Sequence, residues 1–416
     1  MPIGSLLNRW WRQESAWLTF DVMRSDDMSE RRSETELIHA GEGRSQTATP
    51  VTTPIYSSST FTFPSAADLE AYQEGRSDLY IYSRYANPTV QAVEAKLAKA
   101  EAGEAALVLA SGMAATSTAL FGLLQTGDEV ICSSAIYGGT LQVLTSVLSR
   151  FGVRTRFASR SDMANLSAII GPQTKAVWLE SPTNPALRCL DLAAVSAACR
   201  ASGVLSIVDN TFASPVNQQP LTLGADLVMH SATKYLNGHS DVTAGALVGS
   251  RAMIDRLQPA RKMLGGVIDP ASAYALGRGM KTLAVRIARH NDNAMAVARW
   301  LEDHPAVSQV LYPGLASHPD HALATQQMLG FGGMVCFEAK GGQAAAYRFF
   351  DRIGLFQRAA SLGSVESLCS LPVLTSQYGL SDEQLAQAGV TRGMVRLSVG
   401  LEAPEDLIAD VAQALA

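Results

Sequence analysis

Two short apolar runs, each ending on a charged or hydroxyl-rich group, constrain this chain more than any other feature. Residues 204–208 form a β-branched run that ends on Asp209, and about one βα unit later residues 226–230 lead into Ser-Ala-Thr-Lys. Such runs are typical of neighbouring parallel strands. Ligands of open α/β sheets bind outside the carboxyl ends of the strands, so Asp209 and Lys234 are expected to meet at one edge of the sheet.

The residues expected at that edge suit pyridoxal phosphate, which carries an aldehyde, a ring nitrogen and a phosphate. Lys234 would form a Schiff base with the aldehyde, and Asp209 would hold the ring nitrogen protonated. An acid within about 4–6 Å of a cation favours its charged form by roughly 1–3 pKa units, which keeps the ring an electron sink. The hydroxyls of Ser231 and Thr233 would bind the phosphate. Alone, the tetrapeptide leaves an alternative open, in which Asp209 caps a loop and Lys234 is a solvated surface lysine.

The same alternation of strand and helix patterns extends upstream. Each expected strand is followed by a loop that carries a polar or aromatic group, namely Ser111, Tyr137, Asn184, Asp209 and Lys234. Strands alternating with helices predict an α/β fold with a mostly parallel sheet and right-handed crossovers. A sheet built only for packing gives no reason for these groups to share one edge. Tyr137 is expected to stack on a flat cofactor ring, with a core tyrosine as the alternative.

Two further segments can bind an anion. The sequence ASGMAA opens a helix at Gly112 and Met113, whose N–H groups would face a phosphate. This segment is neither a GxGxxG nor a GxxxxGK motif, which disfavours dinucleotide and P-loop sites. Tyr82 and Arg84 precede a helix start at residues 87–89, and they are either an anion-binding pair or ordinary packing of an extended arm.

The pattern changes after Gly245, and we place a domain boundary near Met280. The expected division is a disordered extension at 1–34, an arm at 35–86, a large cofactor domain at 87–280 and a small C-terminal domain at 281–416. Arg396 lies in an alternating strand, MVRLSVGLE, and could clamp a substrate carboxylate or form a salt bridge at a sheet edge. The sequence His-Pro-Asp-His at 318–321 is interpreted as a loop, because no other metal ligands lie nearby.

Bulk properties exclude several classes of partner. The chain has 416 residues and a net charge of -5, with both signs spread along it and no basic run, which argues against nucleic acid. Its five cysteines are odd in number and form no CxxC pair, which is typical of reduced thiols in a cytoplasmic protein. The charge-free residues 105–127 are long enough for a membrane span, but their glycines and threonines fit a strand, a turn and a helix better. The first 27 residues make a poor signal peptide and are expected to be dispensable.

Eight motifs together resemble one family: YSRYANPT, ASGMAA, YGGT, ESPTNP, VDNTFASP, HSATKYLNGHSDVTAG, SLGSVESL and MVRLSVGLE. They are similar to the pyridoxal-phosphate enzymes of Cys/Met metabolism, which include cystathionine γ-synthase, cystathionine γ-lyase and β-lyase, methionine γ-lyase and homoserine-ester sulfhydrylases. The resemblance runs from about Thr35 to the C-terminus. It implies fold type I, with an arm, a large domain and a small domain, and a homotetramer made of two tight dimers.

The resemblance also implies roles for single residues. Lys234 resembles the Schiff-base lysine, Asp209 the partner of the ring nitrogen and Tyr137 the residue stacked on the ring. The residues that match phosphate contacts are Gly112, Met113, Ser231 and Thr233, while Tyr82 and Arg84 match residues that reach the phosphate of a neighbouring subunit. The residues that match the group binding the substrate carboxylate are Asn184, Ser361 and Arg396.

Three departures leave the subclass open. Ala360 stands where enzymes acting on cystathionine typically carry a glutamate, and Gly139 stands where methionine γ-lyases typically carry a cysteine. Thr375-Ser376 replaces a common Thr-His, a change for which we have no physical account. We predict γ-elimination or γ-replacement on a sulfur amino acid or an activated homoserine. The alternatives within the class are a methionine γ-lyase or an O-acyl-homoserine sulfhydrylase, and a cystathionine β-lyase is less favoured. The alternatives from other classes are an aminotransferase and a binding protein without activity.

Overall fold

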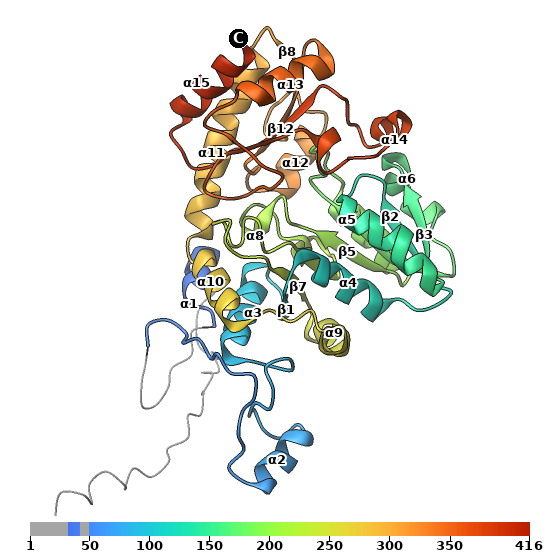
Figure 1. Ribbon diagram of the computed structural model, residues 1–416. Coiled ribbons are helices and arrows are strands. Elements are labelled where there is room, and N and C mark those ends of the chain that lie inside the picture. The colour runs from blue at the N-terminus through green and yellow to red at the C-terminus, as the bar shows by residue number, and fades with distance from the viewer. Residues whose placement is uncertain (1–31, 42–49) are drawn as a thin grey trace, which may run out of the picture.

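The computed structural model describes residues 32–41 and 50–416. The disordered extension expected at 1–34 lies outside the described residues except for its last three, where helix α1 begins. Two β-sheets organise the rest of the chain, one in each half (Figure 1).

The first sheet contains the five strands expected from the sequence. Its seven strands run in the order β1-β7-β6-β5-β4-β2-β3. Only β7 is antiparallel to its neighbours, so the predicted mostly parallel α/β sheet is confirmed. The strands are β1 (Ala105–Leu109), β2 (Glu129–Ser133), β3 (Arg154–Ala158), β4 (Thr174–Glu180), β5 (Leu205–Asp209), β6 (Leu227–His230) and β7 (Gly245–Gly249).

Helices cover both faces of this sheet because its strands are apolar on both sides. In β1, for example, Leu107 and Leu109 pack into a cluster with α4 and α9, whereas Val108 packs with α3 and α10. The helices of this half are α1 (Ser33–His39), α2 (Ala66–Gln73), α3 (Pro88–Ala100), α4 (Gly112–Leu123), α5 (Gly138–Gln142), α6 (Arg160–Ala164), α7 (Leu192–Ala201), α8 (Ser214–Asn217), α9 (Arg251–Leu264) and α10 (Pro270–Met280). Residues 105–127, considered as a membrane span, form β1 and α4, and no helix in the described ranges is long and apolar enough to cross a membrane.

The second sheet has the strand order β10-β11-β12-β9-β8 and is mainly antiparallel. Helix α11 leads into it from α10, and α11, α13 and α15 pack on it around Phe337 and Phe349 (Figure 1). Its strands are β8 (Val307–Leu311), β9 (Met334–Ala339), β10 (Gln357–Arg358), β11 (Leu368–Ser370) and β12 (Met394–Ser398). Its helices are α11 (Leu283–Glu302), α12 (His321–Gln327), α13 (Gly342–Arg352), α14 (Asp382–Gln387) and α15 (Pro404–Leu415).

Two strands of the first sheet were not expected from the sequence. The edge strand β3 reads RTRFA and is largely exposed, so it lacks the apolar run of its neighbours. Strand β7 starts and ends with glycine, where the pattern suggested only a transition. Gly245 has a steric reason, since a Cβ there would lie 2.0 Å from the carbonyl oxygen of Ser111.

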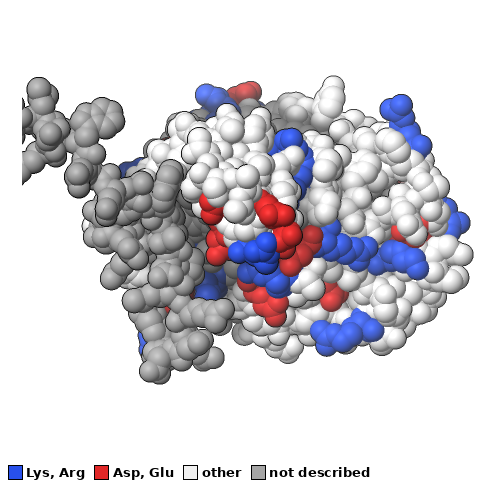
Figure 2. Space-filling model, turned by 90° about the horizontal axis from the view of Figure 1, so that it is seen from below, with Lys and Arg blue, Asp and Glu red and all other residues white. Residues whose placement is uncertain are grey.

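Figure 2 shows the face of the molecule that is seen from below in Figure 1. Acidic and basic side chains gather together near the middle of this face (Figure 2). Arg76 and Glu74, just after α2, form an exposed ion pair.

Candidate active site

Five loops that follow β1, β2, β4, β5 and β6 lie at the carboxyl edge of the first sheet, as the sequence predicts. The second sheet adds residues from the 361 loop and from β12.

Lys234 lies in the turn after β6 and reaches toward the second half of the chain. Its Nζ donates a hydrogen bond of 2.8 Å to Ser361 Oγ. Burial, with a smaller contribution from the positive charge of Arg396, lowers the pKa of Lys234 to about 8. A lysine amine with such a pKa is neutral in a far larger share of molecules near neutral pH than an ordinary lysine, and that share can act as a nucleophile or base. The alternative of a solvated surface lysine is therefore wrong.

Asp209 ends β5 and is 6% exposed. Its Oδ1 accepts a hydrogen bond of 3.0 Å from the Thr211 backbone N–H. Burial raises the pKa of Asp209 against the opposing effect of the Thr211 hydrogen bonds and of His230. A buried carboxylate of this kind gains from a cationic partner, and a protonated ring nitrogen supplies one.

A close approach between two loops forms a candidate phosphate cradle. Gly112 begins α4, and a Cβ on it would lie 2.9 Å from the Cβ of Ser231, so only glycine fits without displacement. The side chain of Ser111 accepts a hydrogen bond from the Ala114 N–H, which leaves the N–H groups of Gly112 and Met113 at the first turn of the helix. Helix N-termini with free N–H groups bind phosphate, so the arrangement suits the expected anion.

The two hydroxyls expected at the cradle have different surroundings. Ser231 is fixed through its backbone, whose N–H donates to Thr211 Oγ1 at 2.8 Å. Thr233 Oγ1 donates to the Ala244 carbonyl at 3.1 Å and accepts from the Ala244 N–H at 2.9 Å. The Thr233 hydroxyl would have to redirect its proton to donate to a phosphate.

Tyr137 precedes α5 and its side chain is 46% exposed, which excludes a core tyrosine. The Tyr137 backbone N–H donates to Glu180 Oε2 at 2.9 Å. A Cβ on Gly139 would lie 2.5 Å from Tyr137 Cε1 and 2.8 Å from Met113 Sδ. The ring of Tyr137 and the Met113 side chain thus lie together over Gly139, beside the cradle.

Arg396, on the central strand β12, is 5% exposed. Its guanidinium donates to Asn184 Oδ1 at 2.9 Å and to the Ser361 carbonyl at 3.3 Å. Burial lowers the pKa of Arg396, and no carboxylate hydrogen-bonds to it among the described side chains. The alternative of a sheet-edge salt bridge is therefore wrong, and the guanidinium retains donors for a substrate carboxylate.

Tyr82 and Arg84 lie elsewhere, in the arm. Arg84 donates to the Lys262 carbonyl at 3.0 Å, and its guanidinium lies 5.6 Å from the ring centre of Tyr82. Among the described residues, neither side chain forms a hydrogen bond or ion pair with Lys234 or Ser231 of the same chain. The resemblance assigned both to a neighbouring subunit, and this placement leaves that assignment as a prediction.

Two important residues were missed in the sequence. Glu180 ends β4 opposite Asp209 in register, is 3% exposed and has a pKa raised well above its usual value by burial and by Asp209. Thr211 bridges Asp209 and Ser231. An acid at the end of an otherwise buried strand was a signal for Glu180, whereas the bridging contacts of Thr211 have no signature in the sequence.

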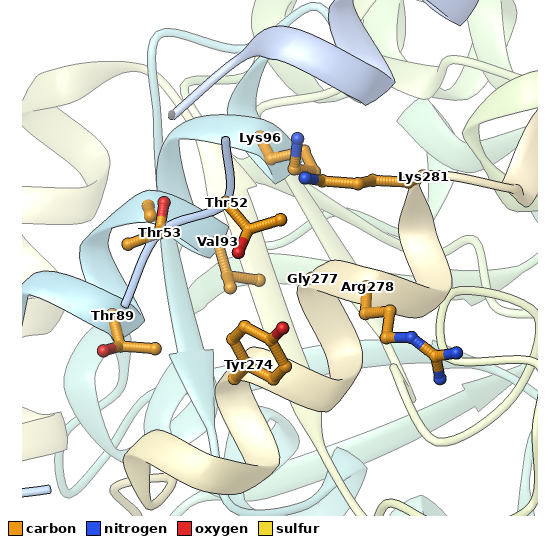
Figure 3. A pocket seen from close by; sticks show the side chains of 10 residues that line it. Thr52, Thr53, Thr89, Val93, Lys96, Tyr274, Gly277, Arg278 and Lys281 are labelled. Atoms are coloured by element: carbon orange, nitrogen blue, oxygen red, sulfur yellow. The ribbon is translucent and has the colours of Figure 1, made fainter. Parts of the chain in front are cut away.

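A hollow of about 140 Å³ lies outside this cluster, between the arm, α3 and α10 (Figure 3). Thr52, Tyr274 and Lys281 line parts of it, and none of the predicted site residues does. The His-Pro-Asp-His segment is a turn that ends at the start of α12, and both of its histidines use Nδ1 in backbone hydrogen bonds. No cluster of three potential metal ligands occurs in the part of the chain that the structure describes.

Comparison with known proteins decides the family. Residues 34–416 match the family described as Cys/Met metabolism PLP-dependent enzyme. The chain belongs to this family. It is 45% identical to the L-methionine gamma-lyase of Pseudomonas putida over 383 residues, which cover 92% of this chain and 96% of that protein.

Other members of the family have different names and a similar fold. The chain is 40% identical to the chloroplastic cystathionine gamma-synthase 1 of Arabidopsis thaliana, with 91% of this chain and 68% of that protein covered. A solved structure of cystathionine gamma-lyase from Lactobacillus plantarum, complexed with L-serine, superposes with a TM-score of 0.87 at 40% identity, covering 92% of this chain and 98% of that one. The predicted family, fold type, cofactor and enzyme class, trans-sulfuration by γ-elimination or γ-replacement, are confirmed.

The residues present fit pyridoxal phosphate. A buried acid, a lysine with a lowered pKa and a helix N-terminus lie at one sheet edge, and the bare backbone of Gly112 gives room for a phosphate against Ser231. These are the groups that the ring nitrogen, the aldehyde and the phosphate of the cofactor require.

Proposed function

We propose that this enzyme removes or replaces the γ substituent of a sulfur amino acid or of an activated homoserine. The observation that carries the proposal is the contact of Lys234 with Ser361, because the Ser361 carbonyl also accepts a hydrogen bond from Arg396. A base and a carboxylate-binding cation are thus joined through one residue. An α-amino acid carries its proton and its carboxylate on the same carbon, so a site that binds it requires a base and a cation near each other.

When bound, pyridoxal phosphate supplies an electron sink for the carbanion that forms at Cα. We assign its ring nitrogen to Asp209, its phosphate to Gly112, Met113, Ser231 and Thr233, and the stacking contact on its ring to Tyr137. These assignments rest on the shared sheet edge and on the cradle described above.

Lys234 would carry protons at Nζ, taking one from the substrate Cα and returning it to a neighbouring carbon. Its lowered pKa supports this role, because a general base is most effective when its pKa lies near the working pH. Ser361 accepts a hydrogen bond from Nζ and would direct the amine. Tyr137 would assist the leaving group, since its half-exposed side chain lies beside Met113 of the cradle.

The substrate carboxylate is assigned to Arg396, with Asn184 and Ser361 holding the guanidinium. Ala360 offers no charge to a distal amine, which supports a γ substituent without a distal amino group, as in methionine, over that of cystathionine. The two more specific candidates within the class are elimination from methionine and sulfhydrylation of an O-acyl-homoserine.

We also propose that the enzyme works as a homo-oligomer, a dimer of dimers in which Tyr82 and Arg84 complete the phosphate site of a neighbouring subunit. Exposed apolar residues support an interface along the arm and the end of α9, with Val51 91% exposed and Met263 77% exposed. Burial of such side chains between subunits is favourable. A cytoplasmic location is supported by five free cysteines, all buried.

The division into domains at 87–280 and 281–416 is retained as a proposal. It is supported by the two sheets, which occupy residues 105–249 and 307–398 on either side of α11.

The test is to record the visible absorbance of the purified protein and to add cystathionine, methionine and O-succinylhomoserine separately, with and without a thiol. Release of a keto acid from one substrate alone identifies a lyase, whereas a requirement for both the homoserine ester and a thiol identifies a γ-synthase or a sulfhydrylase. Loss of the cofactor band and of turnover in Lys234→Ala is expected. Full turnover by that variant would overturn the central assignment.

A further inference from the structure

The His-Pro-Asp-His segment holds a buried acid that the proposed chemistry does not use. Asp320 is 4% exposed and lies just before α12, in the C-terminal half of the chain. Arg160 Nη1 donates to its Oδ2 at 2.8 Å, and Arg188 Nε donates to the same oxygen at 2.6 Å. The Cys189 backbone N–H adds a third bond to Oδ2, at 3.0 Å.

Asp320 is a charged acceptor in this cluster. Burial alone would raise its pKa, but the hydrogen bonds from Arg188 and Arg160 outweigh burial and lower the pKa to about 2. Two arginines from the first sheet's half therefore converge on one carboxylate from the other half. Hydrogen bonds between ionised groups are about twice as strong as neutral ones.

The loop that carries Arg188 is the loop that carries Asn184. Within it, the Arg188 N–H donates to Thr183 Oγ1 at 3.1 Å, and the Thr183 N–H donates to the Arg188 carbonyl at 2.9 Å. Asn184 follows directly and accepts the 2.9 Å hydrogen bond from Arg396. A continuous chain of hydrogen bonds and covalent bonds thus runs from Asp320 to the guanidinium of Arg396.

We propose that Asp320 is a positioning residue for the substrate carboxylate. By holding Arg188 and Cys189 at the end of the loop, it fixes the Asn184 amide, which in turn aims the Arg396 guanidinium. This inference rests on the proposed assignment of Arg396 to the carboxylate. It also gives the 318–321 motif a role other than metal binding.

A purely structural bridge between the two halves would have different consequences. Loss of such a bridge would lower the melting temperature and the fraction of cofactor-loaded enzyme, and it would leave KM unchanged for the enzyme that remains folded. A lost positioning contact raises KM and weakens carboxylate ligands while kcat changes little, because binding to the carboxylate is used in the ground state and in the transition state alike.

The experiment compares Asp320→Asn and Arg188→Gln holoenzymes with the parent. Each variant is assayed for kcat and KM with the substrate found above, and glycine is titrated as a small α-amino carboxylate through the cofactor absorbance. Asp226→Asn is the matched control, because Asp226 accepts hydrogen bonds from Ser206 N and Oγ at 2.8 Å at the start of β5, the opposite edge of the same sheet.

We expect KM and the dissociation constant of glycine to rise together by roughly tenfold in Asp320→Asn, with a similar rise in Arg188→Gln. The double variant should be no worse than the poorer single variant, since both changes cut one chain of contacts. The Asp226→Asn control should lower the melting temperature without changing either constant. If Asp320→Asn does not fold, Arg188→Gln alone carries the test.

Two results separate this inference from the function on which it rests. If Arg396→Lys weakens glycine binding and neither Asp320→Asn nor Arg188→Gln does so beyond the control, the positioning role is wrong and the carboxylate assignment stands. If Arg396→Lys has no effect on glycine binding or KM, the carboxylate assignment itself is wrong.

Discussion

The backbone N–H of Tyr137 donates a 2.9 Å hydrogen bond to the carboxylate of Glu180, which lies beside Asp209 on the next strand. The same carboxylate accepts from the backbone of Asn184, so one buried acid holds the loops that follow β2 and β4. Its pKa is raised well above the usual value, chiefly by burial. Glu180 therefore serves as a hydrogen-bond acceptor that can be neutral.

Two substitutions of Glu180 distinguish the effect of its hydrogen bonds from the effect of its charge. Glu180→Gln keeps an acceptor and should lose less than about 1 kcal/mol of stability, whereas Glu180→Ala leaves two buried donors unpaired and should cost about 2–3 kcal/mol. Urea unfolding measures both. Glu129→Ala is the control. Glu129 accepts a hydrogen bond from the Thr174 hydroxyl at the first residues of β2 and β4, far from the ends that carry Tyr137 and Asn184. Its replacement should reduce stability without reducing cofactor affinity. Equal losses for Gln and Ala at position 180 would contradict this account.

The lowered pKa of Lys234 makes stability depend on pH in a defined window. The pKa of Lys234 is about 8 in the folded chain and 10.5 for an unperturbed lysine. Between these two pH values the unfolded chain binds more protons than the folded chain. The free energy of unfolding therefore rises with pH in this window. Cofactor-free Lys234→Met should be more stable than the parent at about pH 7, by an amount on the order of 2 kcal/mol, and the difference should shrink toward pH ~10.

The measurement is urea unfolding of both cofactor-free proteins across this range of pH. Lys175→Met supplies the control, because it makes the same substitution at an exposed lysine. If the difference in free energy of unfolding between Lys234→Met and the parent is the same at every pH, folding does not lower the pKa of Lys234.

Gly139 leaves room for the Tyr137 ring. In Gly139→Cys the new Cβ would lie 2.5 Å from Tyr137 Cε1, so the ring and the Met113 side chain must move. Both atoms belong to side chains that can rotate away, and stability should fall by less than about 1 kcal/mol. The visible absorbance of the bound cofactor should change, and cofactor affinity should fall. Equilibrium dialysis and absorbance measure these effects.

The control for this substitution is Gly171→Cys, where an added Cβ meets nothing closer than 3.9 Å. We expect the cysteine at 139 not to increase methionine turnover by itself, because it displaces the stacking tyrosine. An increased ratio of methionine to cystathionine turnover, with an unchanged cofactor spectrum, would refute the steric argument.

Sharing of the site between subunits can be tested by mixing two inactive variants. Lys234→Ala lacks the amine and Arg84→Ala lacks the arm cation, so a hybrid dimer contains one site with both groups intact. Activity should reappear after subunit exchange, followed by keto-acid release, with native mass spectrometry confirming the hybrids. Hybrids that form and stay inactive would argue that Arg84 serves its own subunit.

The edge of the first sheet was predictable because its evidence is local. Apolar runs that end on Asp209 or lead into Lys234 indicate both the strands and the loops that follow them, and the structure places them as expected. Strand β3 was missed because an exposed edge strand needs no apolar run, and β7 because its glycines resemble a turn. Contacts across the halves, such as those of Asp320, depend on tertiary packing and leave no periodic pattern.

The absence of a side chain at Gly245 affects the loops on both sides of β7. It opens β7, which lies between β1 and β6, and the loops after those two strands carry Gly112 and Ser231. Even one methyl group at position 245 would collide with the Ser111 carbonyl and push the first loop outward. The distance between the two loops that form the cradle therefore depends on the β7 backbone, because Gly245 has no side chain between them. The width of the cradle is thus determined by the packing of strands in the sheet.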